Sequence, residues 1–175
     1  DGKTGDGAGI HIEIPKDFFI EKIEITGHKF ENSEICVGMI FLPRNNFDAQ
    51  EACRTIVESE LTKSNFSIYG WRQVPVNPKV LGEKADRTRP EITQVLFTHN
   101  NKSLNNKDLE RKLYETRRKI ENVALKNLLE EFYICSLSSK SIIYKGMFLA
   151  EAIADFYLDL QDERFISRYA IFNQR

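Results

Sequence analysis

Hydrophobic positions recur with two different periods along the chain, which predicts both strands and helices. Ile10, Ile12 and Ile14 alternate with polar residues, as in a strand with one buried face, and Pro15 ends this strand. The run 35–42 is apolar without alternation. It predicts a strand that is covered on both faces and lies in the middle of its sheet.

Helical spacing of apolar residues predicts two substantial helices. In 49–62 the spacing follows Asp48 and Glu51, which form a candidate capping box. In 107–129 the apolar stripe lies among dense charge, which predicts a long amphipathic helix. Shorter helices are expected at 16–22 and 148–154.

The remaining segments predict strands joined by loops. Single strands are predicted at 66–69, 93–98 and 169–172. The segment 70–90 is expected to be mostly loop, because Pro75 and Pro78 cannot take part in a central strand. Two short strands, 132–137 and 141–144, surround a polar turn and are expected to form a hairpin. This order of elements favours layered packing of helices over a mainly antiparallel sheet.

Composition restricts the classes of partner. The 175 residues suffice for one domain with its own core. Lys and Arg together (25) nearly balance Asp and Glu together (26), so the charge gives no reason to expect nucleic acid or an anionic membrane as a partner. The longest apolar run, 35–42, is too short to span a bilayer, so no membrane anchor is expected.

Cysteines and histidines give no sign of a metal site. Three scattered cysteines lie among apolar residues: Cys36, Cys53 and Cys135. They are expected to be small buried residues of a protein in a reducing compartment. There is no Cys-x-x-Cys pair and no close pair of histidines, so no metal ligand is expected. The three histidines are expected at the surface and not in a triad: His11, His28 and His99.

Two further features are expected to be structural. Trp71, which stands near two prolines, is expected to anchor its loop on the core. The basic residues of 107–129 alternate with glutamates at helical spacing, so they are expected to pair locally on a solvated face.

Motifs appear from the start of the chain to its end. Residues 4–9 have the sequence Thr-Gly-Asp-Gly-Ala-Gly and precede the first predicted strand. Further blocks follow in order: Val37-Gly38-Met39-Ile40-Phe41-Leu42-Pro43, Gly70-Trp71-Arg72, Tyr144-Lys145-Gly146-Met147, Phe156-Tyr157 with Asp159-Leu160, and Asn173-Gln174-Arg175. In this order the blocks resemble those of glutamate synthases, and the resemblance spans the whole chain.

The resemblance implies a fold. Glutamate synthases start with a class II glutamine amidotransferase domain of the amino-terminal-nucleophile hydrolase type. The implied fold class is α+β, an αββα sandwich with two stacked sheets between helix layers. Residues 1–175 are expected to form a single partial domain of this type, incomplete at both ends.

The resemblance also implies where the catalytic groups lie. The family's nucleophile is a cysteine at the mature amino terminus, whose α-amine acts as its base. It is expected before Asp1, and the family's oxyanion Asn-Gly pair is expected after Arg175, so no catalytic residue is expected in this chain. Cys36 is rejected as the nucleophile because it lies within a buried-strand pattern and has no free α-amine.

Substrate-binding candidates lie at the two ends of the chain. Arg175 corresponds to the family's arginine that holds the α-carboxylate of glutamine, although Asn173 stands where the family has histidine. The glycine-rich loop is expected to be a tight turn or to line the site: Gly5, Asp6, Gly7 and Gly9. A phosphate-binding role for this loop is disfavoured, because the Lys-Ser/Thr of such loops is missing.

The parent protein is expected to hydrolyse glutamine to glutamate and ammonia, which then serves the reductive amination of 2-oxoglutarate. Its FMN and iron–sulfur cluster are expected in other regions, so this chain should bind neither. The implied partners are glutamine and the remaining domains of the synthase, in the cytoplasm or the plastid stroma. The alternative is a non-catalytic binding or scaffold module with the same fold; the parent's upstream sequence, with or without Cys-Gly-x-Gly, would distinguish the two.

Overall fold

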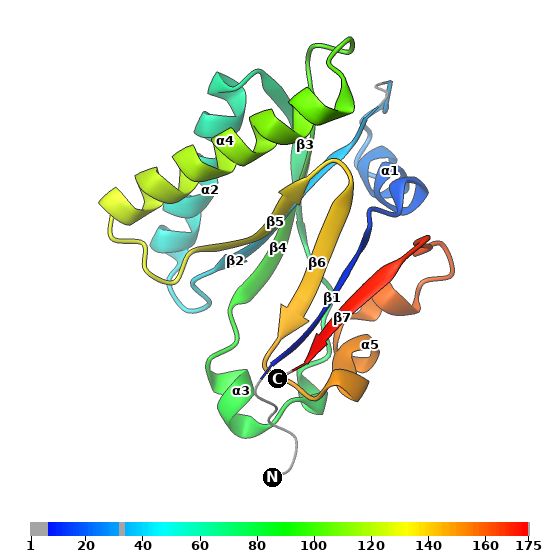
Figure 1. Ribbon diagram of the computed structural model, residues 1–175. Coiled ribbons are helices and arrows are strands. Elements are labelled where there is room, and N and C mark those ends of the chain that lie inside the picture. The colour runs from blue at the N-terminus through cyan, green and yellow to red at the C-terminus, as the bar shows by residue number, and fades with distance from the viewer. Residues whose placement is uncertain (1–6, 32–33, 175) are drawn as a thin grey trace.

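The computed structural model describes residues 7–31 and 34–174 and contains two antiparallel sheets. The larger sheet has the strand order β3-β4-β2-β5, and the smaller has the order β6-β1-β7. The strands are β1 (Ala8–Glu13), β2 (Cys36–Leu42), β3 (Phe66–Gln73), β4 (Glu91–His99), β5 (Tyr133–Ser138), β6 (Ser141–Gly146) and β7 (Ala170–Gln174). Figure 1 shows helices α2 (Phe47–Lys63) and α4 (Asn106–Lys126) on the side of the larger sheet that faces away from the smaller one.

One hydrophobic core lies between the two sheets. It combines buried side chains of β1 and β6, such as Ile12 and Ile142, with Val37 and Met39 of β2 and Leu96 of β4. Helix α1 (Lys16–Glu24) adds three buried side chains at one end of this core: Phe18, Phe19 and Ile23. Burial of so much apolar surface holds the sheets face to face.

A second core lies between the larger sheet and the helix pair. Cys36 and Ile40 of β2 pack there with Val57 of α2 and Leu113 of α4. Strand β2 is therefore buried on both faces, and it lies between β4 and β5. The prediction of a central strand at 35–42 is confirmed.

Short helical segments connect the long elements. They are the 3₁₀ turns η1 (Pro78–Val80), η2 (Ala150–Ala152) and η3 (Leu158–Gln161) and the helices α3 (Glu83–Arg87) and α5 (Ile153–Phe156). The single helix predicted at 148–154 is thus a 3₁₀ turn followed by a short α-helix. All five residues of β7 are exposed, so within the described part of the chain no element covers this strand.

The prediction of a β5–β6 hairpin is wrong. Strand β5 pairs with β2 in the larger sheet, whereas β6 pairs with β1 in the smaller one. The turn between them crosses from sheet to sheet and is held by Glu110 of α4. Its carboxylate accepts hydrogen bonds from Ser138 Oγ (2.9 Å) and from the N and Oγ of Ser139 (both 2.7 Å).

Two local predictions also need correction. The N-cap of α2 is Asn46, whose Oδ1 accepts from Ala49 N at 3.0 Å, and not Asp48. Strand β3 continues through Trp71 and Arg72 to Gln73, because it lies at the edge of its sheet and ends before Pro75. Among the helices of the described residues, none combines the length and the apolar character that a membrane span requires.

Candidate functional site

A cleft of about 720 Å³ lies over the smaller sheet. Gly7 and Gly9 at the start of the chain line it, together with His11 of β1, Lys145 of β6 and Asn173 of β7. Phe41 and Tyr133 of the larger sheet contribute to the same cleft. Residues from both ends of the sequence therefore share one concave surface.

Strand register brings these ends together. Strand β1 pairs with β7 so that Ala8 lies opposite Gln174 and Gly9 lies opposite Asn173. Figure 1 shows β1 and β7 side by side, with the start of β1 and the end of β7 at the same end of the smaller sheet. The described part of the glycine-rich loop is thus next to the described part of the Asn-Gln-Arg segment. Arg175, Gly5 and Asp6 lie outside the described residues.

The two described glycines of the loop are needed for different structural reasons. Gly7 has a φ of 135°, a backbone conformation that residues with a side chain rarely adopt. Gly9 lies opposite Lys145 in the β1–β6 pair, and a Cβ atom on Gly9 would lie 2.9 Å from Lys145 Cβ and 3.2 Å from the carbonyl oxygen of Tyr144. Gly9 therefore permits a close approach of β1 to β6 beside the cleft.

The cleft presents hydrogen-bond donors. Lys145 Nζ donates to Tyr133 Oη at 2.6 Å and lies 4.4 Å from the centre of the Tyr133 ring. Within residues 7–31 and 34–174 no carboxylate pairs with Lys145. His11 Nε2 is buried and, among the described groups, has no hydrogen-bond partner. The Lys145 ammonium group and the side-chain amide of Asn173 can therefore bind a ligand that carries a carboxylate or an amide.

The three cysteines are all buried and free, as predicted. Cys135 lines the cleft, but its thiol donates to the carbonyl oxygen of Ile143 at 3.4 Å, and burial raises its pKa to about 12. Burial raises the pKa of Cys53 to about 11, and burial, aided by Glu110 and Glu34, raises that of Cys36 further. Because the thiolate is the nucleophile, none of the three is activated for attack.

A buried polar network lies behind the cleft, between the sheets. Arg72 donates from its two terminal nitrogens to the carboxylate of Asp159 at 2.7 and 2.9 Å, and to Gln94 Oε1 at 2.6 Å. Tyr144 Oη donates to Asp159 Oδ2 at 3.0 Å and accepts from Gln94 Nε2 at 3.0 Å. Four polar side chains from β3, β4, β6 and η3 thus satisfy one another inside the molecule.

Arg72, Tyr144 and Asp159 belong to the motifs quoted from the sequence, but their contacts with one another and with Gln94 were not predicted. The contact of Tyr157, whose hydroxyl donates to the carbonyl oxygen of Lys145 at 2.7 Å, was not predicted either. No sequence period marks such a contact, because a buried tyrosine looks like any other core aromatic. The one sequence signal that pointed to a buried polar network was the presence of polar residues within these motifs.

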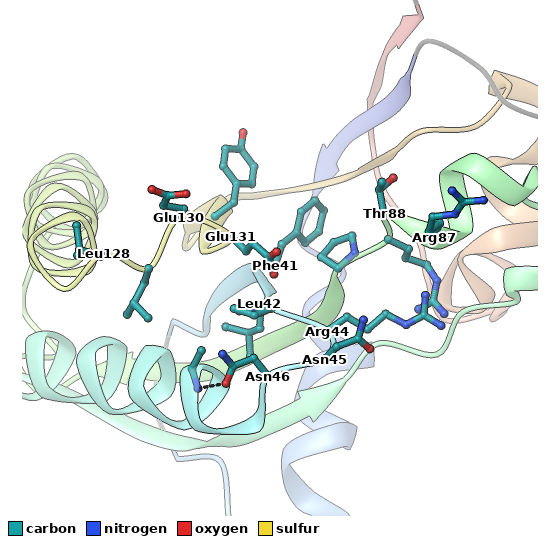
Figure 2. A pocket seen from close by; sticks show the side chains of 16 residues that line it. Phe41, Leu42, Arg44, Asn45, Asn46, Arg87, Thr88, Leu128, Glu130 and Glu131 are labelled. Atoms are coloured by element: carbon teal, nitrogen blue, oxygen red, sulfur yellow. Dashed lines mark hydrogen bonds between the residues drawn. The ribbon is translucent and has the colours of Figure 1, made fainter.

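A second cleft, of about 690 Å³, adjoins the first at Phe41 and Tyr133, which line both. Figure 2 shows Glu130 and Leu128 on one side of it and Arg44 and Arg87 on the other. All three arginines of this cleft already have carboxylate partners: Arg44 and Arg89 pair with Asp86 (3.5 and 3.0 Å), and Arg87 pairs with Glu83 (3.1 Å). The first cleft is therefore the better candidate site for a ligand carboxylate.

Other residues singled out from the sequence lie elsewhere. Trp71 packs partly buried on the helix-side core and donates from Nε1 to Glu58 Oε1 at 2.7 Å, so it anchors β3 to α2. His28 is exposed, but the prediction that His99 lies at the surface is wrong, since it is 7% exposed and contacts Phe66. On α4, Arg117 pairs with Glu121 at 2.8 Å as expected, and also donates to the carbonyl oxygen of Ile134 at 2.8 Å.

The fold and the matched family agree. The chain belongs to the class II glutamine amidotransferases, because the model of this family, "Glutamine amidotransferases class-II", matches residues 1–175. The expected α+β sandwich of amino-terminal-nucleophile hydrolase type is confirmed.

Its relatives include glutamate synthases. The chain is 53% identical over 175 residues to the "Glutamate synthase [NADPH] large chain" of Azospirillum brasilense, and 42% identical over 177 residues to "Ferredoxin-dependent glutamate synthase 1, chloroplastic/mitochondrial" of Arabidopsis thaliana. A third relative is the "Ferredoxin-dependent glutamate synthase, chloroplastic" of Spinacia oleracea, at 40% identity over 177 residues. Each match covers 100% of this chain but 12%, 11% and 11% of the respective relatives.

Proposed function

We propose that this chain forms part of the glutamine site in the glutaminase domain of a glutamate synthase. The parent protein hydrolyses glutamine with water to glutamate and ammonia, and the ammonia serves the reductive amination of 2-oxoglutarate. The observation that carries the proposal is the register of β1 against β7, because it brings Gly9 and Asn173 to one cleft. Arg175, next but one to Asn173 in the sequence, holds the α-carboxylate of glutamine by paired hydrogen bonds.

The attacking thiol comes from another part of the parent polypeptide. Buried thiols with raised pKa support this, since the three cysteines of this chain are unsuited to attack. The chain by itself therefore releases no ammonia from glutamine. Release that is abolished by Cys36→Ser would overturn this assignment.

The parent's FMN and iron–sulfur cluster belong to other regions. The donor set of this chain does not suit a cluster held by four thiolates, since Cys36 and Cys53 lie in the helix-side core and Cys135 lies between the sheets. The described residues also contain no group of three or more His, Cys, Asp or Glu that could hold a metal ion. The remaining domains of the synthase are the implied partners, in the cytoplasm or, in a photosynthetic eukaryote, the plastid.

The test uses the full-length parent protein with the change Arg175→Lys, which keeps the charge but removes the planar pair of donors. We expect the KM for glutamine to rise about tenfold or more, with the reaction driven by ammonium salts unchanged. The matched control is Arg168→Lys, because Arg168 is exposed and pairs with Glu13 outside the cleft.

Two results would count against the proposal. An unchanged KM in the Arg175 variant of an active enzyme would remove the assigned role of Arg175. A wild-type parent without glutaminase activity would overturn the function and favour the scaffold alternative.

A further inference from the structure

Lys145 lies between two buried tyrosines. Tyr144 precedes it on β6 and is 0% exposed; Tyr157 follows α5 and is also 0% exposed. Side chains alternate along a strand, so Tyr144 points into the core between the sheets while Lys145 lines the cleft. Neither tyrosine is among the residues that line the cleft.

The Lys145 backbone is fixed from the interior by Tyr157. The Tyr157 hydroxyl donates to the Lys145 carbonyl oxygen at 2.7 Å. The Tyr157 ring packs edge-on against the Tyr144 ring, with 4.8 Å between the ring centres. Burial raises the pKa of Tyr157 well above its ordinary value, so the hydroxyl keeps its proton and remains a donor. A donor in this place fixes the orientation of the peptide that joins Lys145 to Gly146.

Tyr144 is fixed in turn by the polar network. Its hydroxyl donates to Asp159 and accepts from Gln94, and Asp159 is held by two bonds from Arg72. The hydroxyl therefore has a single favourable orientation, and the Tyr144 side chain cannot shift without breaking bonds to β4 and η3.

The third constraint comes from the facing strand. Gly9 lies opposite Lys145 with no space for a side chain between them. The Lys145–Gly146 end of β6 is thus fixed by Tyr144 and Tyr157 from the core and by Gly9 from the neighbouring strand. A small shift there moves the cleft wall that carries the Lys145 ammonium group.

We propose that Tyr157 and Tyr144 are positioning residues for the glutamine cleft, acting through the Lys145–Gly146 end of β6 and not by contact with glutamine. The inference rests on the proposed function, since it takes this cleft to be the glutamine site. It assigns the buried network a role in substrate binding beyond holding the sheets together.

The experiment is Tyr157→Phe in the full-length parent, which removes one hydroxyl and keeps the ring. We expect the KM for glutamine to rise about fivefold, the scale of one lost hydrogen bond, with kcat within about twofold. The reaction driven by ammonium salts stays at the wild-type rate. The matched control is Tyr114→Phe, because Tyr114 is 64% exposed on α4 and should leave both constants unchanged.

A second comparison separates positioning from a general loss of stability. Lys145→Ala should raise the KM for glutamine by itself, and adding Tyr157→Phe to it should raise the KM little further, because both changes act on one group. If the two single increases in KM multiply in the double variant, Tyr157 acts on another part of the molecule, and the proposal is overturned.

Tyr144→Phe is expected to give a similar rise in KM and decides the question if the Tyr157 variant fails to fold. Wild-type values of KM in both variants, in a parent that hydrolyses glutamine, would overturn the inference and leave the proposed function intact. A parent that hydrolyses no glutamine at all would overturn both.

Discussion

Arg72 and Asp159 form a two-bond ion pair in the space between the sheets, with N–O distances of 2.7 and 2.9 Å. Their side chains are 16% and 3% exposed. Burial disfavours the charge on Arg72, but the bonds to Asp159 outweigh this and raise the pKa of the guanidinium above its ordinary value. The pair ties the edge strand β3 to the η3 turn, which is distant in the sequence.

Asp159→Asn should destabilise the domain strongly. The change leaves the guanidinium of Arg72 buried without a negative partner, and removal of one member of such a pair costs about 3 kcal/mol. Hydrogen exchange of β3 and β6 amides in the full-length protein measures the loss as a lower free energy of opening. Asp155→Asn is the control, since Asp155 is exposed and should change this free energy by less than about 0.5 kcal/mol. Equal protection in both variants would mean that the ion pair contributes little.

Glu110→Ala should loosen the turn between β5 and β6. The carboxylate of Glu110 accepts three hydrogen bonds from Ser138 and Ser139. Its loss leaves these partly buried donors without an acceptor, at a cost of about 2 kcal/mol. Hydrogen exchange of the β5 and β6 amides is the measurement, and Glu115→Ala on the exposed side of α4 is the control. No difference between the two variants would contradict the role of Glu110.

This turn shows where sequence reasoning reached its limit. The strands on each side were predicted within a few residues from their apolar patterns. The hairpin prediction failed because two adjacent strands joined by a polar turn have the same local pattern in both cases, whether they pair with each other or belong to different sheets. The deciding contact comes from Glu110, which the pattern assigned to a solvated helix face. A long-range contact of this kind has no local signal.

Gly9→Ala should destabilise the domain more than the same change at an ordinary strand position, and it should also disturb the cleft. The new methyl group would meet Lys145 Cβ at 2.9 Å, so β1 and β6 must separate. We expect a loss of about 1 to 3 kcal/mol, with a higher KM for glutamine in the full-length enzyme.

Gly27→Ala provides the control for this change. Gly27 has a φ of 86°, and no atom lies within 4 Å of a new Cβ. The Gly27 variant therefore measures the effect of backbone strain without that of a close approach. It should cost about 1 kcal/mol and leave the KM for glutamine unchanged. A normal KM in the Gly9 variant would show that the close approach has no effect on the cleft.

The sequence offered the glycine-rich loop and the Asn-Gln-Arg segment as candidates, but only the fold shows that their described residues lie side by side. Strand order is decided by the packing of both sheets, so the register of Gly9 against Asn173 could not be derived from either segment alone. The roles of Tyr144 and Tyr157 were hidden for the same reason. Each hydroxyl finds its partner on a different element.

His99 should make the β3–β4 end of the larger sheet sensitive to acid. Burial lowers the pKa of its imidazole from 6.5, and its Nδ1 accepts a hydrogen bond from Asn101 N at 3.1 Å, which the charged ring could not do. The folded state therefore binds the proton less readily than the unfolded state. Stability at this end is kept above pH 6.5 and falls as the pH drops below it.

Hydrogen exchange of the Phe66 and His99 amides, corrected for the intrinsic effect of pH, measures this dependence. Between pH 7.5 and 5.5 we expect the free energy of opening to fall, because the unfolded state takes up the His99 proton more readily than the folded state does. His99→Gln should remove the dependence because its amide oxygen can accept the same bond and does not titrate. His28→Gln, at an exposed position, should retain it. A dependence that survives in the His99 variant would mean that another group in this sheet takes up the proton.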